Sequence, residues 1–281
     1  MTTKERINTT QFLHVVSVSS GAASAYTWHL VAQEHGAEHV TGLFADVNGE
    51  DPDNYRFLAD VHRHIGGLLV TLDNGGRTIW DAMREQRFLA NTRVDTCSKH
   101  LKRKPLMAWC KEHAAGATVY LGYDWTEANR RSGRSRSEYE AEGFTVRYPM
   151  VERLDDKQTA IDWCYSVGIT PPALTVEGHP HANCRGGCVK SGARQFKRLL
   201  RERPADFAWW EQNEREMREF LGADVAILRD RRGGATTPLT LEHLRLLTCN
   251  GQAGLFDDDD QAACGCMTAN EAHERIPQEA T

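Results

Sequence analysis

Short apolar runs alternate with segments of helical periodicity along the first half of this chain. The apolar runs are rich in β-branched residues and end in polar or glycine-containing turns, a pattern typical of strands inside a sheet. We predict strands at residues 12–18, 40–45, 68–72 and 118–121 and helices at 24–35, 53–65, 78–89 and 98–113. Because strands and helices alternate, we expect an α/β fold with a parallel sheet covered on both faces.

The second half of the chain is less regular and more helical. We predict a short strand at residues 145–148 and helices at 156–166, 190–201 and 205–221. From about Leu247 the composition changes, and an acidic run follows at Asp257–Asp260. The pattern therefore predicts one domain over residues 1–235 and a flexible acidic tail over residues 236–281.

The composition is that of an ordinary globular protein, with 281 residues, 40% hydrophobic and 26% charged. No apolar run approaches the length of a membrane span, and the first ten residues lack the apolar core of a signal peptide. We therefore expect a cytoplasmic protein without a membrane partner. A net charge of −5 argues against a wholly basic nucleic-acid binder and leaves room for a local basic groove.

The turn after the first predicted strand has the composition of an anion-binding loop. Ser19, Ser20, Gly21 and Ser24 offer hydroxyls and backbone N–H groups without bulky side chains, and the following helix would point its positive end at the same place. This turn lies at a strand–helix junction, where open α/β sheets bind their ligands. It lacks the Gly-Lys-Ser/Thr ending of the Walker phosphate loop. We predict that it holds a phosphate or pyrophosphate group.

Eight cysteines are more than a chain in a reducing compartment needs for packing, and there they favour metal binding or redox chemistry over disulfides. Cys110 and Cys164 lie in helical, apolar-periodic segments and are predicted core residues. Cys97 precedes a predicted helix, whose N-terminus would favour its thiolate. Cys184 and Cys188 flank a glycine-rich turn that brings two thiols together without packing them.

Four further segments complete an ordered set of motifs. They are Phe44-Ala45-Asp46-Val47-Asn48-Gly49-Glu50, Leu121-Gly122-Tyr123-Asp124-Trp125-Thr126-Glu127-Ala128-Asn129-Arg130, Tyr148-Pro149-Met150 with Gly168-Ile169-Thr170-Pro171-Pro172, and Asn183-Cys184-Arg185-Gly186-Gly187-Cys188-Val189-Lys190. Together with the serine turn, they resemble the phosphoadenosine phosphosulfate (PAPS) reductase family, within the adenine-nucleotide α-hydrolase superfamily, over about residues 12–220. The resemblance implies an open, mostly parallel, doubly wound sheet with a helical C-terminal part.

The resemblance also implies an adenine nucleotide, PAPS or ATP, as the ligand of the serine turn. The family's usual Ser-Gly-Gly-x-Asp-Ser loop reads Ser-Ser-Gly-Ala-Ala-Ser here, so Ala23 stands where an acid is expected. Asp46, after the second strand, could contact ribose or hold Mg²⁺, or be a solvated loop acid. Glu127 and Arg130 match family positions near the nucleotide. Arg130, Arg131, Arg134 and Arg136 form a basic loop that could neutralise an anion or remain solvated.

Three hypotheses fit the cysteines. Cys97, Cys184 and Cys188 could hold an iron–sulfur cluster with one open iron, and family members often carry a four-iron cluster bound by four cysteines including an adjacent pair, which is absent here. Alternatively, His179 and His181 could complete a zinc site with Cys184 and Cys188. In the third hypothesis the cysteines are catalytic redox thiols or unrelated to one another.

The first expected function is sulfonucleotide reduction, assisted by thiols or an iron–sulfur cluster and supplied by a thioredoxin-like reductant. An alternative is ATP-dependent adenylation and thiolation of a nucleic-acid base, with a sulfur donor. Another is a non-catalytic nucleotide-binding or zinc-stabilised adaptor. Cys264 and Cys266 in the predicted tail could attack a sulfonyl sulfur or pass on a persulfide, or be incidental thiols.

Overall fold

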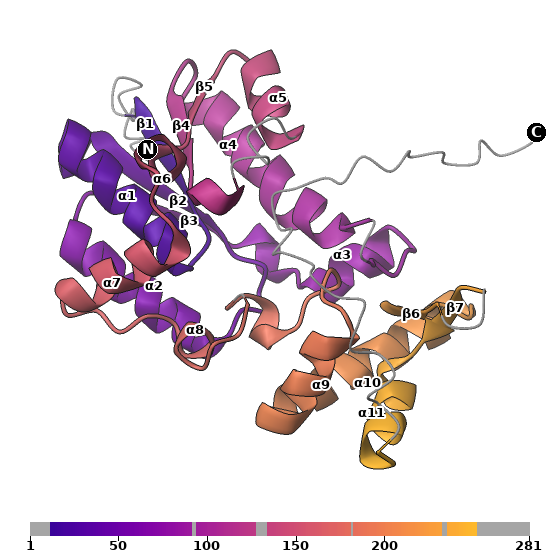
Figure 1. The fold of residues 1–281 in the computed structure, drawn as a ribbon. Coiled ribbons are helices and arrows are strands. Elements are labelled where there is room, and N and C mark those ends of the chain that lie inside the picture. Colours follow the sequence, from indigo (N-terminus) through magenta and orange to yellow (C-terminus); the bar gives the residue numbers. More distant parts are fainter. Residues whose placement is uncertain (1–11, 92–93, 128–133, 181, 232–234, 252–281) are drawn as a thin grey trace, which may run out of the picture.

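The computed structural model describes residues 12–91, 94–127, 134–180, 182–231 and 235–251, except for the side chains of residues 134 and 135. Five strands form a parallel sheet in the order β3-β2-β1-β4-β5 (Figure 1). Their bounds are β1 His14–Val18, β2 Val40–Ala45, β3 Leu68–Leu72, β4 Thr118–Leu121 and β5 Thr145–Arg147. The predicted α/β fold with an open parallel sheet is therefore confirmed.

The strand order places a switch point beside the central strand. The chain moves outward from β1 to β2 and β3, and then returns to the other side of β1 to form β4. The register is continuous across the centre, because His14 pairs with both Val40 and Thr118. Loops at the carboxyl ends of β1 and β4 diverge at such a point and leave a crevice for a ligand.

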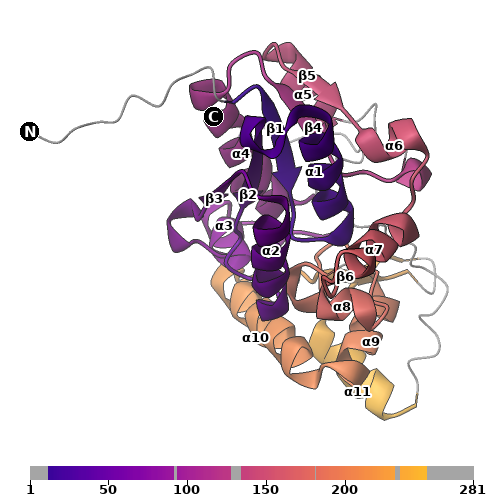
Figure 2. The ribbon, with the colours of Figure 1, turned by 90° about the vertical axis from the view of Figure 1, so that its left-hand side faces the viewer.

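Helices cover both faces of the sheet, and a further group lies below it in Figures 1 and 2. Helices α1, α2 and α7 share one core with the sheet, whereas α4 packs on the opposite face. The helices are α1 Ala22–His35, α2 Pro52–Ile65, α3 Ile79–Glu85, α4 Lys104–His113, α5 Arg134–Ala141, α6 Pro149–Arg153, α7 Lys157–Ser166, α8 Ala173–Val176, α9 Ala193–Glu202, α10 Pro204–Leu221 and α11 Leu241–Cys249.

Some of the helices begin after a side chain that caps them. Asp51 caps α2 by accepting from the Asp53 amide at 2.9 Å, and Asp156 caps α7 by accepting from the Thr159 amide. Thr78 and Asp81 form a reciprocal capping box at α3. The helix predicted from residue 98 begins instead with a π-helical segment, Ser98–Arg103, before α4.

A second core joins α9, α10 and α11 to α3 and to a small antiparallel sheet, β6 Leu228–Asp230 and β7 Thr237–Leu239. β7 and α11 occupy residues that the sequence analysis assigned to the flexible tail. They are packed because Leu239, Leu241 and Leu244 are buried against this core. Glu214 on α10 accepts from the amides of Ile227 and Leu241, which fixes both β6 and the start of α11. The packed structure therefore continues beyond residue 235.

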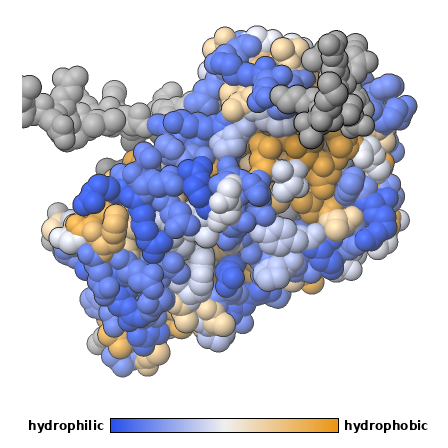
Figure 3. All heavy atoms as spheres, turned by 180° about the vertical axis from the view of Figure 1, so that it is seen from behind, coloured by the Kyte–Doolittle hydropathy of each residue, from blue (hydrophilic) through white to orange (hydrophobic). Residues whose placement is uncertain are grey.

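The surface of the molecule is largely polar, as expected for a chain with an ordinary globular composition. Seen from behind, the molecule shows mostly hydrophilic side chains, with a hydrophobic area on one side (Figure 3). Among the described helices, none combines the length and the apolar character that crossing a membrane requires.

Candidate functional site

The serine turn closes on itself through hydroxyl groups. The Ser19 amide donates to Ser24 Oγ at 3.0 Å, the Ser19 hydroxyl donates to the same atom at 3.2 Å, and Ser24 Oγ donates to the Gly21 carbonyl at 2.9 Å. Ser20 has a φ of 56° and donates its hydroxyl to the Ser19 carbonyl. These hydroxyls shape the loop, and the amides of the first turn of α1, which have no intrahelical partner, are the groups left to bind an anion.

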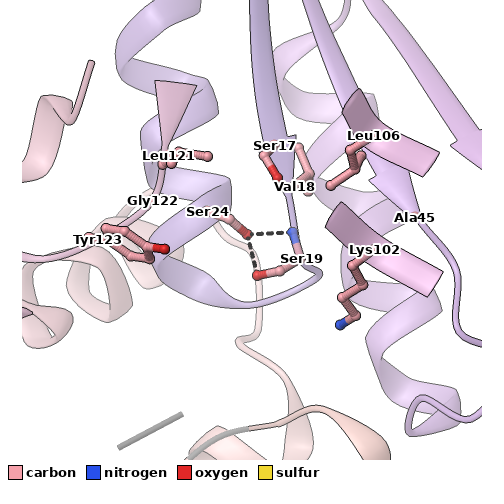
Figure 4. A pocket seen from close by; sticks show the side chains of 10 residues that line it. All are labelled: Ser17, Val18, Ser19, Ser24, Ala45, Lys102, Leu106, Leu121, Gly122 and Tyr123. Atoms are coloured by element: carbon pink, nitrogen blue, oxygen red, sulfur yellow. Dashed lines mark hydrogen bonds between the residues drawn. The ribbon is translucent and has the colours of Figure 1, made fainter. Parts of the chain in front are cut away.

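The end of β4 lies directly against this turn. A Cβ on Gly122 would be 2.7 Å from Ser24 Cα and 2.9 Å from the Ser24 nitrogen, so only glycine allows this approach. The two segments border a pocket at the switch point, with Lys102 across from the turn (Figure 4). We call it the loop cavity; its lining residues are Ser17, Val18, Ser19, Ser24, Ala45, Lys102, Leu106, Leu121, Gly122 and Tyr123.

Asp46 follows β2 and holds the loop that leads to α2. Its Oδ1 accepts from the Asn48 amide at 2.8 Å and from the Tyr55 hydroxyl at 2.8 Å. Burial, together with this carboxylate, raises the pKa of Tyr55 well above its usual value. Asp46 does not line the loop cavity. In the structure its carboxylate has a positioning role, and a contact with ribose or Mg²⁺ stays a prediction.

The predicted basic loop is only partly described. Glu127 follows β4, and its amide donates to the Asp124 carbonyl at 3.1 Å. Arg136, predicted in a loop, lies instead on α5 and pairs with Glu140 at 2.7 Å. The i,i+4 spacing of these two residues supports the short helix. Several predicted residues lie outside the described residues, namely Arg130, Arg131, His181, Cys264 and Cys266.

Cys97, Cys184 and Cys188 line one small cavity, which we call the thiol cavity. Cys97 precedes the π-helical segment, whereas the other two come from the loop between α8 and α9. The remaining lining residues are Val47, Ile79, Asp95, Ser98, Lys102, Val189 and Lys190. Residues almost a hundred positions apart thus meet around one space. The two other candidates, Cys110 and Cys164, are buried in the core as predicted, and burial raises the pKa of each to about 12.

Lys102 belongs to the walls of both cavities. Its ammonium donates to Glu50 Oε1 at 3.1 Å, and Glu50 Oε2 accepts from the Cys184 amide at 2.9 Å. The Glu50 side chain is fully buried. Through these contacts the segment after β2, the π-helical segment and the thiol loop converge on one carboxylate.

The backbone at Cys184 is left-handed over three residues. Cys184, Arg185 and Gly186 have φ values of 53°, 55° and 75°, and such a conformation costs about 1–2 kcal/mol for each residue with a side chain. Two side chains hold the turn: Trp210 Nε1 donates to the Cys184 carbonyl at 3.1 Å, and Gln195 Nε2 donates to the Gly186 carbonyl at 2.8 Å. Backbone strain held by surrounding contacts is typical of functional sites.

Close packing and a sulfur hydrogen bond define the other end of the turn. A Cβ on Gly187 would lie 2.2 Å from Trp210 Nε1, so this position also requires glycine. The Lys190 amide donates to Cys188 Sγ at 3.4 Å. A hydrogen bond donated to sulfur favours the thiolate over the thiol.

Paired charges surround the thiol cavity. Lys190 Nζ lies 3.3 Å from Asp95 Oδ2, and an Arg103 nitrogen lies 3.7 Å from Asp95 Oδ1. Burial raises the pKa of Asp95, and the two cations oppose that shift. With Lys102 and Glu50 nearby, three cations face two carboxylates, a balance that favours a bound anion or a thiolate.

The candidate ligands that the structure describes are not arranged as a metal site. Within the described residues, no group of three or more His, Cys, Asp or Glu side chains is arranged to hold a metal ion. His179 does not line the thiol cavity; it is buried, its Nδ1 lies 3.0 Å from Gln195 Nε2, and burial lowers its pKa. Neither the iron–sulfur nor the zinc hypothesis is supported by these positions, and no chemical step is assigned to a metal.

Sequence reasoning missed the two lysines and the close approach of Gly122. Lys190 follows Cys188 in a motif that the sequence shows, so its nearness to the thiols could have been found. Lys102 comes five residues after Cys97, a spacing that separates side chains by roughly 140° on an α-helix. The π-helical segment changes that geometry, and nothing in the residue pattern predicts it.

Comparisons with known proteins give one type of match. No family model matches the chain, and no curated protein matches it significantly. Among solved structures, it is similar to a phosphoadenylyl-sulfate (PAPS) reductase from Candida auris in a phosphate complex. The sequence identity is 14%, the alignment covers 63% of this chain and 83% of that chain, and the TM-score is 0.47. The likeness is one of fold.

Proposed function

We propose that this protein binds an adenine nucleotide at the loop cavity and reduces a sulfonate group on it with the thiols of the second cavity. The observation that carries the proposal is the shared wall: Lys102 lines both cavities, so an anion-binding turn and three cysteines meet at one cation. A nucleotide whose phosphates lie against the N-terminus of α1 would direct its anionic end towards this lysine. PAPS has the required chemistry, because its sulfonate is such an end group.

The proposed reaction uses two thiols and one external dithiol. The Cys188 thiolate, favoured by the Lys190 amide, attacks the sulfonate sulfur, and the sulfur–oxygen bond breaks with its electron pair leaving on the nucleotide. The product is an S-sulfocysteine at Cys188, in which the transferred SO₃⁻ group is bonded to Sγ. The Cys184 thiolate then attacks Cys188 Sγ, which releases sulfite and forms a disulfide. A thioredoxin-like dithiol reduces that disulfide, so two electrons pass from the dithiol to sulfur.

The charged side chains act on the anion before and during transfer. Lys102 and Lys190 stabilise the sulfonate oxygens, and Glu50 and Asp95 keep both lysines in place. The buried carboxylates also prevent an excess of positive charge when no ligand is bound. In this proposal the side chains of the protein stabilise the anion without a metal ion.

The test is sulfite release from PAPS with a thioredoxin-like reductant. We expect Cys188→Ser to abolish sulfite release while the product nucleotide, adenosine 3′,5′-bisphosphate, still binds by calorimetry. The matched control is Cys110→Ser, since Cys110 is a buried core thiol outside both cavities, and we expect it to retain turnover. Nucleotide-dependent pyrophosphate release that requires RNA or DNA would instead favour base thiolation, and nucleotide binding without turnover would favour an adaptor.

Ser24→Ala tests the loop separately from the thiols. The change removes the acceptor of the Ser19 amide and the donor to the Gly21 carbonyl, so the turn loses about 1 kcal/mol. We expect a several-fold weaker affinity for the nucleotide, with thiol alkylation rates unchanged. Unaltered affinity would contradict the proposed role of this turn.

A further inference from the structure

We propose that Glu50 is a positioning residue that couples the two cavities, holding Lys102 at their shared wall and Cys184 in its left-handed turn. The inference rests on the proposed function, because it takes the cavity thiols as the reacting groups. Glu50 differs from Asp95, the other acid near the thiols, because one of its partners, Lys102, lines both cavities, whereas Lys190 and Arg103, the partners of Asp95, do not line the loop cavity.

The two carboxylate oxygens of Glu50 have different partners. Oε1 accepts from the Lys102 ammonium at 3.1 Å, and Oε2 accepts from the Cys184 amide at 2.9 Å. The carboxylate is fully buried, and the lysine side chain is only 9% exposed. Neither contact is a surface ion pair that solvent could replace, so a change at Glu50 is transmitted to both partners.

A purely structural carboxylate in the same chain provides the contrast. Glu214 is also buried and also accepts from two donors, the amides of Ile227 and Leu241. Neither partner lines either cavity. If Glu50 acted only as packing, its removal would resemble removal of Glu214. If Glu50 positions the site, the effects on the thiols must differ.

The neutral variant Glu50→Gln keeps the shape of the side chain and removes its charge. The amide oxygen still accepts from Lys102, so the ammonium stays charged, whereas the amide NH₂ cannot accept from the Cys184 amide. Lys102 and Lys190 then face the thiols with one carboxylate fewer. More positive charge near a thiol lowers its pKa. We expect the cavity thiols to titrate about one pH unit lower than in the wild type.

The experiment measures iodoacetamide alkylation at each cysteine against pH, with peptide mass spectrometry as the readout. Below the thiol pKa, a downward shift of one unit increases the alkylation rate of Cys184 or Cys188 about threefold, because part of the tenfold gain in thiolate is offset by lower nucleophilicity. Cys110 and Cys164 report on unfolding, since both are fully buried and should stay slow. Glu50→Asp should bring the profile back towards the wild type, because it restores the charge.

The outcomes of this experiment test the role of Glu50 separately from the proposed function. A cavity-thiol profile unchanged in Glu50→Gln, or shifted equally by Glu214→Gln, overturns the role of Glu50. The titration needs no substrate, so it tests the role of Glu50 whether or not the protein has the proposed activity. If the wild-type protein releases no sulfite, that result refutes only the proposed function. Where sulfite is released, we expect Glu50→Gln to lower kcat at least tenfold with a smaller change in KM. An unchanged kcat contradicts the coupling.

Discussion

The serine turn, which lines the loop cavity, and the turn at residues 184–187, the thiol turn, beside the thiol cavity are built differently. Ser19, Ser24 and Gly21 bond one another within five residues of sequence. The turn at Cys184 depends on partners that lie 134 and 26 residues away, Glu50 and Trp210. A site element made of local bonds forms with its helix, whereas one made of distant bonds needs the complete fold. The thiol turn should therefore be more sensitive to substitutions in the core.

The largest effect is expected for Gly187→Ala. A Cβ 2.2 Å from Trp210 Nε1 cannot be accommodated, because Trp210 is fully buried and packed against Trp80 and Phe196. Overpacking and loss of the bond to the Cys184 carbonyl should lower the free energy of unfolding by about 4 kcal/mol. Urea denaturation measures this loss.

A glycine of the serine turn serves as the control for that substitution. Gly21 has a φ of −108°, and its added Cβ would come no closer than 3.8 Å to Ser19 Oγ. Gly21→Ala should cost less than about 1 kcal/mol, the usual difference between these residues at a helix N-cap. Similar losses in the two variants would contradict the contrast between local and distant bonding.

Gly122→Ala should affect the serine turn where the end of β4 lies against it. The new Cβ would meet the Ser24 backbone at 2.7–2.9 Å, and backbone atoms on α1 cannot rotate away as a side chain can. We expect β4 and α1 to separate, with a loss of about 3 kcal/mol in stability and a marked loss of nucleotide affinity. Calorimetry with adenosine 3′,5′-bisphosphate checks the second effect. Retained affinity would show that the turn does not need this close approach.

Local signals predicted most of the fold. The strands at residues 40–45, 68–72 and 118–121 have the predicted bounds, because compact apolar runs end at polar or glycine turns. The predicted start of α7 follows from Asp156 as its cap. The helix predicted at residues 78–89 ends earlier, at Glu85, and the one predicted from residue 190 begins at Ala193, since helix ends depend on the packing of neighbouring loops.

The candidate site could be predicted only where its functional residues lie close together in the sequence. The serine turn and the cysteine-glycine turn are visible in the residues, but their shared wall is not, because it requires Lys102 to reach both from a π-helical segment. The packing of residues 237–249 was missed for a similar reason. Leu241 and Leu244 are buried by α9 and α10, and a short apolar pattern cannot show that a partner exists.

The smallest effect concerns pH and the buried carboxylate of Glu214 in the second core. Burial raises the pKa of Glu214 to about 7 from an unperturbed 4.5, so the folded state binds this proton more tightly than the unfolded chain does. Its stabilising contribution is complete below pH 4.5 and is lost as the pH rises through 7, and the loss between pH 5 and pH 8 amounts to about 2.5 kcal/mol. Because Glu214 fixes β6 and the start of α11, whose residues line neither cavity, the loss should loosen these two segments and leave both turns intact. We expect the unfolding free energy of the wild type to fall more between pH 5 and pH 8 than that of Glu214→Gln. Over the same pH range, hydrogen exchange of the Ile227 and Leu241 amides should gain this additional acceleration in the wild type alone. Equal slopes in the two proteins would place the pH dependence elsewhere in the chain.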